Sequence, residues 1–338
     1  MVELWGLLEE QIIDRNIDPD IKVEVLRTLT ESFLNLDRWE DAIRIGRKAV
    51  EIAEAEPSVS QLNRVGSLQF LTFAMHKSDH PETAAHYERL LSSDLGPVQS
   101  TAMMNSYATW LRAQGDYKGA LHYFDLAIAN AQHQAHDLST GYIYGNSALL
   151  LCDRAMYEQC VERLKRAAEI WAGAGEPPNT SLYRAMADAH LFKGDYPAAL
   201  EYARVAVERG EAVTPDTVEH MRALLALLAA QTQNGLLVEA EETQARMLSM
   251  AETILDEDHP DWPAMLHAVA RLDLAQGDAD EAIAKLHKAR EMRSSSNNYT
   301  LFWSRVDRLE GQARIHAGLP GGDALLEKAE AYVASLAQ

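Results

Sequence analysis

The 338-residue chain is short of cysteine, of basic residues and of long apolar runs. Its only cysteines are Cys152 and Cys160, which excludes a disulfide framework and favours a reducing compartment. The longest apolar run, Ala223 to Ala230, is too short to span a membrane. Lysine and arginine number 31 against 51 acidic residues, a net charge of −20. This deficit argues against nucleic-acid binding and against adsorption to an anionic membrane.

Sequence motifs for catalysis are also missing. The chain has no Gly-rich phosphate loop followed by Lys, no GxGxxG, no HExxH, no CxxC and no GxSxG. His76, His80 and His86 gather near one turn, but a helix break separates the first two, so we expect a solvated turn there. We therefore predict no catalytic residues, no cofactor and no metal. The first residues show neither a basic region nor a cleavage site, and we expect a cytoplasmic protein.

The residues that are present favour helices. The apolar share is 47%, which is enough for a core, while glycine (18) and proline (11) are few. Stretches such as 101–114 and 198–209 consist of good helix formers, and strand-type alternation is nearly absent. The sequence predicts an all-α protein.

A pattern recurs about every forty residues. Gly115-Asp116-Tyr117 followed by Ala120 returns at Gly194 and at Gly277, and weaker copies fill the gaps. Small residues then fall at positions 42, 84, 120, 160, 199, 240, 282 and 324. We predict a short N-terminal helix within residues 1–17 and eight repeats in a single domain over 1–338. The approximate repeat bounds are 20–56, 60–95, 98–136, 140–175, 179–213, 216–258, 261–296 and 299–338.

Each repeat has the features of a helical hairpin. The glycine can adopt the left-handed conformation that ends a first helix, and the following Asp can cap a second. Asp278 with Glu281, and Asp37 with Glu40, have capping-box spacing. Cys160 replaces the small alanine and is interpreted as a packing thiol. Because one hairpin cannot bury both of its apolar faces, neighbouring hairpins are expected to stack as a solenoid.

Segment 101–130 resembles a tetratricopeptide repeat. The matching positions are Ala108, Gly115, Tyr117, Ala120, Phe124 and Ala127. The long period is similar to the repeats of kinesin light chains and of bacterial maltose-activator-type regulators. The resemblance implies a right-handed α-solenoid whose first helices line a concave groove for a protein or peptide ligand. It implies nothing more specific, since such repeats serve many partners.

Helix periodicity selects polar residues on the first helices of the repeats as candidates for ligand contact. These are Gln69, Asn105, Thr109, Arg112, Tyr142, Asn146, Arg184, Asp188, His267 and Arg271, with Glu310 and Arg314 offered by the last repeat. The amides of Asn105 and Asn146 suit a peptide backbone, because an amide donates and accepts at once. Arg112 and Arg184 suit ligand carboxylates. The alternative, that these positions are simply solvated, stays open.

Three functions are consistent with this pattern. The first is a non-catalytic scaffold that binds a protein or peptide. The second is the sensor portion of a bacterial peptide-responsive or maltose-activator-type system, and the third is a helical-repeat enzyme. The charge is local: residues 1–56 and 214–258 each carry −7, whereas 96–136 is neutral. The two acidic blocks offer docking surfaces for basic partners, and self-association stays open.

Overall fold

The computed structural model describes residues 17–131, 138–292 and 300–336. Within these ranges every regular element is a helix, which confirms the all-α prediction. The helix predicted within residues 1–17 lies almost wholly outside the described residues. The chain forms two compact units, residues 1–135 and 136–338, and each is described by itself.

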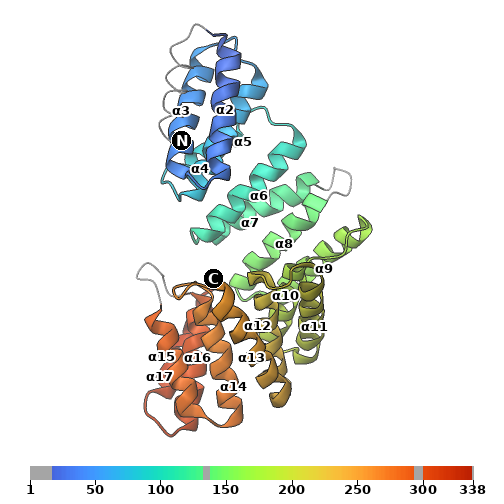
Figure 1. Cartoon of the computed structure of the whole chain (residues 1–338), viewed down its shortest axis with the longest axis vertical. Helices are drawn as coiled ribbons and strands as arrows, with labels where there is room; N and C mark the ends of the chain where they lie inside the picture. Colours follow the sequence, from blue (N-terminus) through green and yellow to red (C-terminus); the bar gives the residue numbers. More distant parts are fainter. Residues whose placement is uncertain (1–16, 132–137, 293–299, 337–338) are drawn as a thin grey trace. The chain divides into compact units, whose positions relative to one another are not determined.

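The N-terminal unit contains three helix pairs among its described residues (Figure 1). Its helices are α2 (Pro19–Asn35), α3 (Trp39–Ala55), α4 (Gln61–Lys77), α5 (Thr83–Leu91), α6 (Pro97–Ala113) and α7 (Tyr117–Ala131). Proline stands in the first turn of α2 and of α6, where its missing N–H removes no intrahelical bond.

The C-terminal unit contains five helix pairs among its described residues, so that the whole chain shows about eight. Its helices are α8 (Leu138–Asp153), α9 (Tyr157–Gly173), α10 (Thr180–Lys193), α11 (Tyr196–Val213), α12 (Val218–Gln233), α13 (Leu237–Ile254), α14 (Trp262–Gln276), α15 (Ala279–Glu291), α16 (Leu301–His316) and α17 (Gly322–Leu336). Each even-numbered helix packs on its own partner and on the next even-numbered helix, so α8 to α16 share one surface of this unit.

The turns within the pairs follow the predicted pattern at three glycines. Gly115, Gly194 and Gly277 all have φ between 82° and 96°, the left-handed region that a side chain disfavours. The Asp116 carboxylate accepts a hydrogen bond from the Gly119 N–H at 2.9 Å, as predicted for a cap at the start of the second helix.

The two predicted capping boxes are wrong. Asp278 precedes α15 but accepts no capping hydrogen bond through its side chain. Asp37 has φ 55° and occupies the left-handed turn position itself, while Arg38 takes the N-cap position of α3. The chain has no glycine at this turn, so Asp supplies the left-handed residue and cannot also be the cap.

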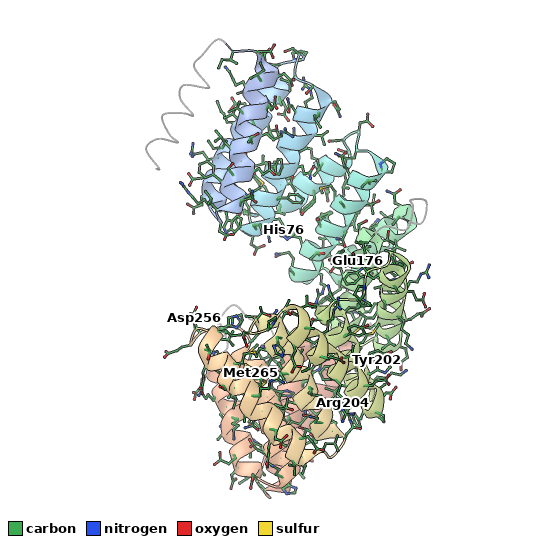
Figure 2. The ribbon with its side chains drawn as sticks, turned by 45° about the vertical axis from the view of Figure 1, so that its right-hand side comes forward. His76, Glu176, Tyr202, Arg204, Asp256 and Met265 are labelled. Atoms are coloured by element: carbon green, nitrogen blue, oxygen red, sulfur yellow. A yellow bond between two sulfur atoms is a disulfide. The ribbon has the colours of Figure 1, made fainter. Side chains whose placement is uncertain are left out.

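The small residues lie at the helix crossings in six of the eight pairs. Ala42, Ala120, Cys160, Ala199, Ala240 and Ala282 are fully buried. In the second pair the buried small residue is Thr83 rather than Ala84, and in the last pair it is Gly322 rather than Ala324. Around these crossings the larger core side chains pack, among them Met265 of α14 (Figure 2).

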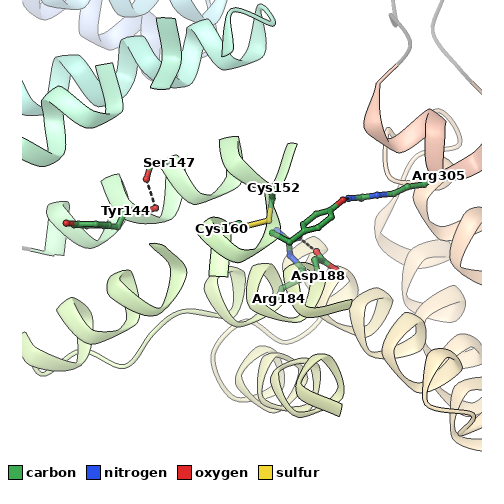
Figure 3. The surroundings of a disulfide bond; sticks show 8 residues. Tyr144, Ser147, Cys152, Cys160, Arg184, Asp188 and Arg305 are labelled. Carbon is green, nitrogen blue, oxygen red and sulfur yellow. Dashed lines mark hydrogen bonds and ion pairs between the residues drawn. A yellow bond between two sulfur atoms is a disulfide. The ribbon is translucent and has the colours of Figure 1, made fainter. Parts of the chain in front are cut away.

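Cys160 is buried at the helix crossing as expected, but the interpretation of it as a thiol is wrong. Cys152, near the end of α8, and Cys160, in the first turn of α9, form a disulfide within one helix pair. Their Cα atoms are 5.5 Å apart, inside the range that a disulfide requires. The antiparallel hairpin brings together residues eight apart in sequence, which spacing alone did not indicate. Figure 3 shows this bond and the side chains around it.

Among the described residues, none of the helices combines the length and apolar character needed to cross a membrane.

Candidate functional site

A cavity of about 230 Å³ lies between the even-numbered helices of the C-terminal unit. We call it the arginine cavity, because its charged and imidazole lining residues are Arg184, Asp188, Arg222, Asp261, His267, Arg271 and Arg305. Arg184 and Asp188 are four residues apart on α10, as are His267 and Arg271 on α14, so each pair projects from one helix face. The cavity therefore collects charge from four successive even-numbered helices.

Two of the arginines have carboxylate partners within the chain. Arg184 contacts Asp188 at 3.3 Å (Figure 3). It also contacts Glu219 at 3.5 Å. Arg222 contacts both carboxylate oxygens of Asp261, at 2.7 and 3.2 Å. This fork-to-fork geometry leaves the Asp261 carboxylate committed to Arg222.

The other two arginines are less well compensated. Arg305 donates to the Tyr157 hydroxyl at 3.1 Å, and its guanidinium carbon lies 3.2 Å from the centroid of the Phe192 ring. Arg271 makes no ion pair or hydrogen bond with any described residue, and burial and the charge of Arg305 lower its pKa to about 10. Asp188 attracts both guanidiniums, but its ion pair is with Arg184. The cavity therefore carries excess positive charge.

His267 lines the same cavity as a neutral base. The residue is 7% exposed, and its Nε2 has no hydrogen-bond partner among the described residues. Burial, helped by the charges of Arg271 and Arg305, lowers its pKa well below the ordinary value of 6.5. A buried ring nitrogen without a partner is costly, so it marks a place where a ligand atom would be stabilising.

A second cavity, of about 330 Å³, adjoins the first. We call it the amide cavity, because Asn146 and Asn179 line it together with Tyr142 and Trp171. Arg184 and Arg222 line both cavities, which places the two next to each other along α8, α10 and α12. Tyr142 is 53% exposed and meets the Trp171 ring edge to face at 4.8 Å between centroids.

The N-terminal unit has its own cavity, of about 700 Å³, between α2, α4 and α6. Asn105 and Thr109, two of the candidates selected from the sequence, line it together with His76 and the rings of Phe70 and Phe73. His76 Nδ1 lies 2.7 Å from the Tyr87 hydroxyl, and burial lowers the pKa of His76. Gln69 and Arg112 lie on the same helices but do not line this cavity.

The structure thus gathers four sequence candidates, Arg184, Asp188, His267 and Arg271, into one cavity and places Tyr142 and Asn146 beside it. Sequence reasoning missed Arg222, Arg305, Phe192 and Phe302. The last three follow a signal that was available: Phe192 is four residues after Asp188, and Phe302 and Arg305 are three apart.

Of the two candidates offered for the last repeat, Glu310 is contradicted by its burial. Glu310 is 3% exposed and lies in an ion-pair network with Arg290, Arg314 and His287. Its contacts point toward α15, and on α16 it is Arg305 that lines the arginine cavity.

Metal binding gains no support from the described residues. Among them, no group of three or more His, Cys, Asp or Glu side chains converges as a metal ion would require.

No protein-family model matches the sequence, and none of the curated proteins does. Solved structures do resemble the fold. A tetratricopeptide repeat protein from Parabacteroides merdae matches with a TM-score of 0.60 at 12% identity, over 86% of this chain and 98% of that one. The apo form of RapI matches with a TM-score of 0.60 at 12% identity, over 93% and 86%.

A third structure, NprR in complex with its cognate peptide NprX, matches with a TM-score of 0.58 at 15% identity, over 78% of this chain and 76% of that one. At these identities the likeness concerns the fold alone. The chain has the fold of tetratricopeptide-repeat proteins, which confirms the resemblance drawn from segment 101–130.

Proposed function

We propose that this chain is a non-catalytic peptide-binding module whose ligand lies along the even-numbered helices of the C-terminal unit. The observation that carries the proposal is the pair of adjoining cavities on one helical surface, the amide cavity and the arginine cavity. The amide cavity presents amides and the rings of Tyr142 and Trp171, and the arginine cavity presents guanidiniums and the rings of Phe192 and Phe302.

An extended peptide suits this surface better than a compact small molecule does. Every residue of such a peptide exposes an N–H donor and a carbonyl acceptor, and the amides of Asn146 and Asn179, which line the amide cavity, carry groups of both kinds. Tyr142 and Trp171 form an aromatic wall beside it for an apolar side chain. The structurally similar NprR was solved with a peptide, which supports the same class of ligand here.

An array of random nonapeptides, anchored by their N-termini and probed with the fluorescently labelled full chain, tests the proposal. We expect a set of peptides to bind and Asn146→Ala to weaken that binding by about 1–2 kcal/mol, because a ligand backbone group loses its partner. Gln159→Ala removes an exposed amide from α9 and is the matched control. If no peptide binds, the proposal is wrong.

The cavity of the N-terminal unit supports a second candidate, docking of a protein partner. Its 700 Å³ and the rings of Trp39, Phe70 and Phe73 suit apolar side chains of a partner. Peptides that lose binding on Phe73→Ala but keep it on Asn146→Ala would assign the binding to this cavity.

A sensor role is proposed in addition. Binding at either cavity would then have to change the conformation of the chain and so its contacts with another component. Solution scattering with and without an array-selected peptide would detect such a change.

A further inference from the structure

The arginine cavity carries more positive charge than the chain itself neutralises. Of its two aspartates, Asp261 is held by both oxygens on Arg222, and Asp188 is paired with Arg184. Arg271 and Arg305 line the same cavity, and the charge of Arg305 disfavours the charged form of Arg271. Two like charges in a partly buried cavity are unfavourable unless an anion joins them.

A second, independent observation points to a ligand at the same place. The His267 Nε2 is buried and has no hydrogen-bond partner among the described residues, the residue as a whole is more than nine-tenths buried, and it lines the cavity together with both arginines. A neutral imidazole can donate to a carboxylate oxygen or accept from a peptide N–H, whichever tautomer the ligand selects.

The remaining lining residues of the arginine cavity are apolar, and they indicate which ligand group lies next to the anion. The Phe302 ring meets His267 edge to face, with centroids 5.8 Å apart, and Phe192 holds the Arg305 guanidinium against its face. A guanidinium fixed on a ring presents its remaining N–H groups in a plane, which matches a carboxylate. The ligand group that fits is therefore a carboxylate next to an apolar side chain.

We propose that Arg271, Arg305 and His267 bind a carboxylate of the peptide ligand, so that the module recognises acidic or free-C-terminal peptides. This rests on the proposed function, since it names the chemistry of the ligand at that same surface. It also reverses the expectation from net charge: the chain is acidic overall, yet this surface selects an anion. The carboxylate belongs either to a peptide C-terminus or to an Asp or Glu side chain.

Two probes test the cavity with the full chain. The first is a pair of small molecules, N-acetyl-L-phenylalanine and its amide, which differ in the carboxylate; saturation-transfer NMR compares their binding. The second is the nonapeptide array, made once with free and once with amidated C-termini, and with each Asp or Glu of the selected peptides exchanged for Asn or Gln.

We expect the acid to bind at least about tenfold more tightly than the amide, and Arg271→Gln or Arg305→Gln to abolish that difference. Arg204→Gln removes one exposed positive charge from α11 and is the control (Figure 2). The melting temperature of the free Arg271→Gln variant distinguishes lost binding from misfolding. Because the substitution removes one of two repelling charges, the melting temperature should rise, whereas misfolding would lower it.

Each outcome decides one point. Loss of binding on amidation assigns the carboxylate to the C-terminus, and loss on the Asp or Glu exchange assigns it to a side chain. Equal binding of acid and amide, or array peptides selected for Lys and Arg, overturns the carboxylate proposal while peptide binding stands. Binding of the small acid without any array peptide leaves the anion site in place and removes the peptide function.

Discussion

His267 is a buried base that the folded chain keeps neutral, and this makes stability depend on pH. Its pKa is well below 6.5 in the folded state because of burial and the neighbouring Arg271 and Arg305, whereas in the unfolded chain it is ordinary. Below pH 6.5 the unfolded state therefore binds a proton that the folded state does not. Stability contributed by this residue is complete above pH 6.5 and falls as pH drops below that value.

We expect His267→Gln to flatten the loss of stability between about pH 6.5 and 5, where each pH unit costs up to about 1.4 kcal/mol per such histidine. Urea unfolding at a series of pH values measures the slope. The control is His122→Gln, since His122 is exposed on α7. An unchanged slope in the His267 variant would show that its ring is solvated in the folded chain.

At the scale of helices, α8 offers an internal comparison between two glycines. A Cβ at Gly141 would lie 1.9 Å from Trp171 Nε1, whereas a Cβ at Gly145 would meet nothing within 4 Å. Both alanine variants gain the same helix propensity of about 1 kcal/mol. Gly145→Ala should therefore be stabilising, whereas Gly141→Ala should destabilise by about 1–3 kcal/mol through overpacking against the buried indole.

Urea unfolding and tryptophan fluorescence check this pair, because the Gly141 variant must displace Trp171 and so shift its emission. If Gly141→Ala proves as stable as Gly145→Ala with unchanged emission, the close contact between α8 and α9 is not present in solution.

The last three helices are joined by buried charges. Asp307 is fully buried and Glu310 is 4% exposed at its side chain; Arg290 of α15 contacts both carboxylates, and Lys328 of α17 contacts Asp307. The contacts with Arg290 and Arg314 lower the pKa of Glu310 against the effect of burial. The network connects α15, α16 and α17.

Arg290→Met should destabilise the chain by about 3–5 kcal/mol, because it leaves two buried carboxylates short of positive charge. Lys288→Met, an exposed position on the same helix, is expected to change stability by less than about 0.5 kcal/mol. Chemical denaturation at neutral pH compares the two. Equal effects would mean that water reaches the carboxylates and replaces Arg290.

The sequence predicted the helix pairs best where the turn chemistry is strict. Gly115, Gly194 and Gly277 could be placed because a left-handed residue is needed at that turn. Repeats two and eight were aligned one or two residues out, since several small residues stand near each crossing and only packing selects Thr83 and Gly322. Correcting the last repeat by two residues moves the candidate position from Glu310 to Arg308, which lies three residues from Arg305 on α16.

The chain as a whole carries a net charge of −20, whereas the arginine cavity carries excess positive charge. Exposed acids such as Glu239, Glu241 and Glu242 lie on the odd-numbered helix α13, while the arginines of the cavity lie on even-numbered helices. The candidate residues were predictable from helix periodicity, which assigns a face. The sequence did not show which arginines lack a neutralising carboxylate. That depends on partners distant in sequence, such as Asp261, which pairs with Arg222 from 39 residues away.

This separation predicts an unusual response of ligand binding to salt. A chain of net charge −20 repels an acidic peptide at long range, although the arginine cavity attracts its carboxylate at contact. The screening length falls from about 30 Å at 0.01 M to about 8 Å at 0.15 M salt, so added salt removes the repulsion first. The association rate of an acidic array-selected peptide should therefore rise severalfold over this range, because salt screens the long-range repulsion that slows association at low salt. The dissociation rate should change less, since contacts inside the cavity are shorter than the screening length.

Stopped-flow fluorescence with the labelled peptide measures both rates, and Arg204→Gln should leave the trend unchanged. An association rate that falls with salt would mean that attraction by the arginine cavity, and not repulsion by the net charge, governs the approach of the peptide.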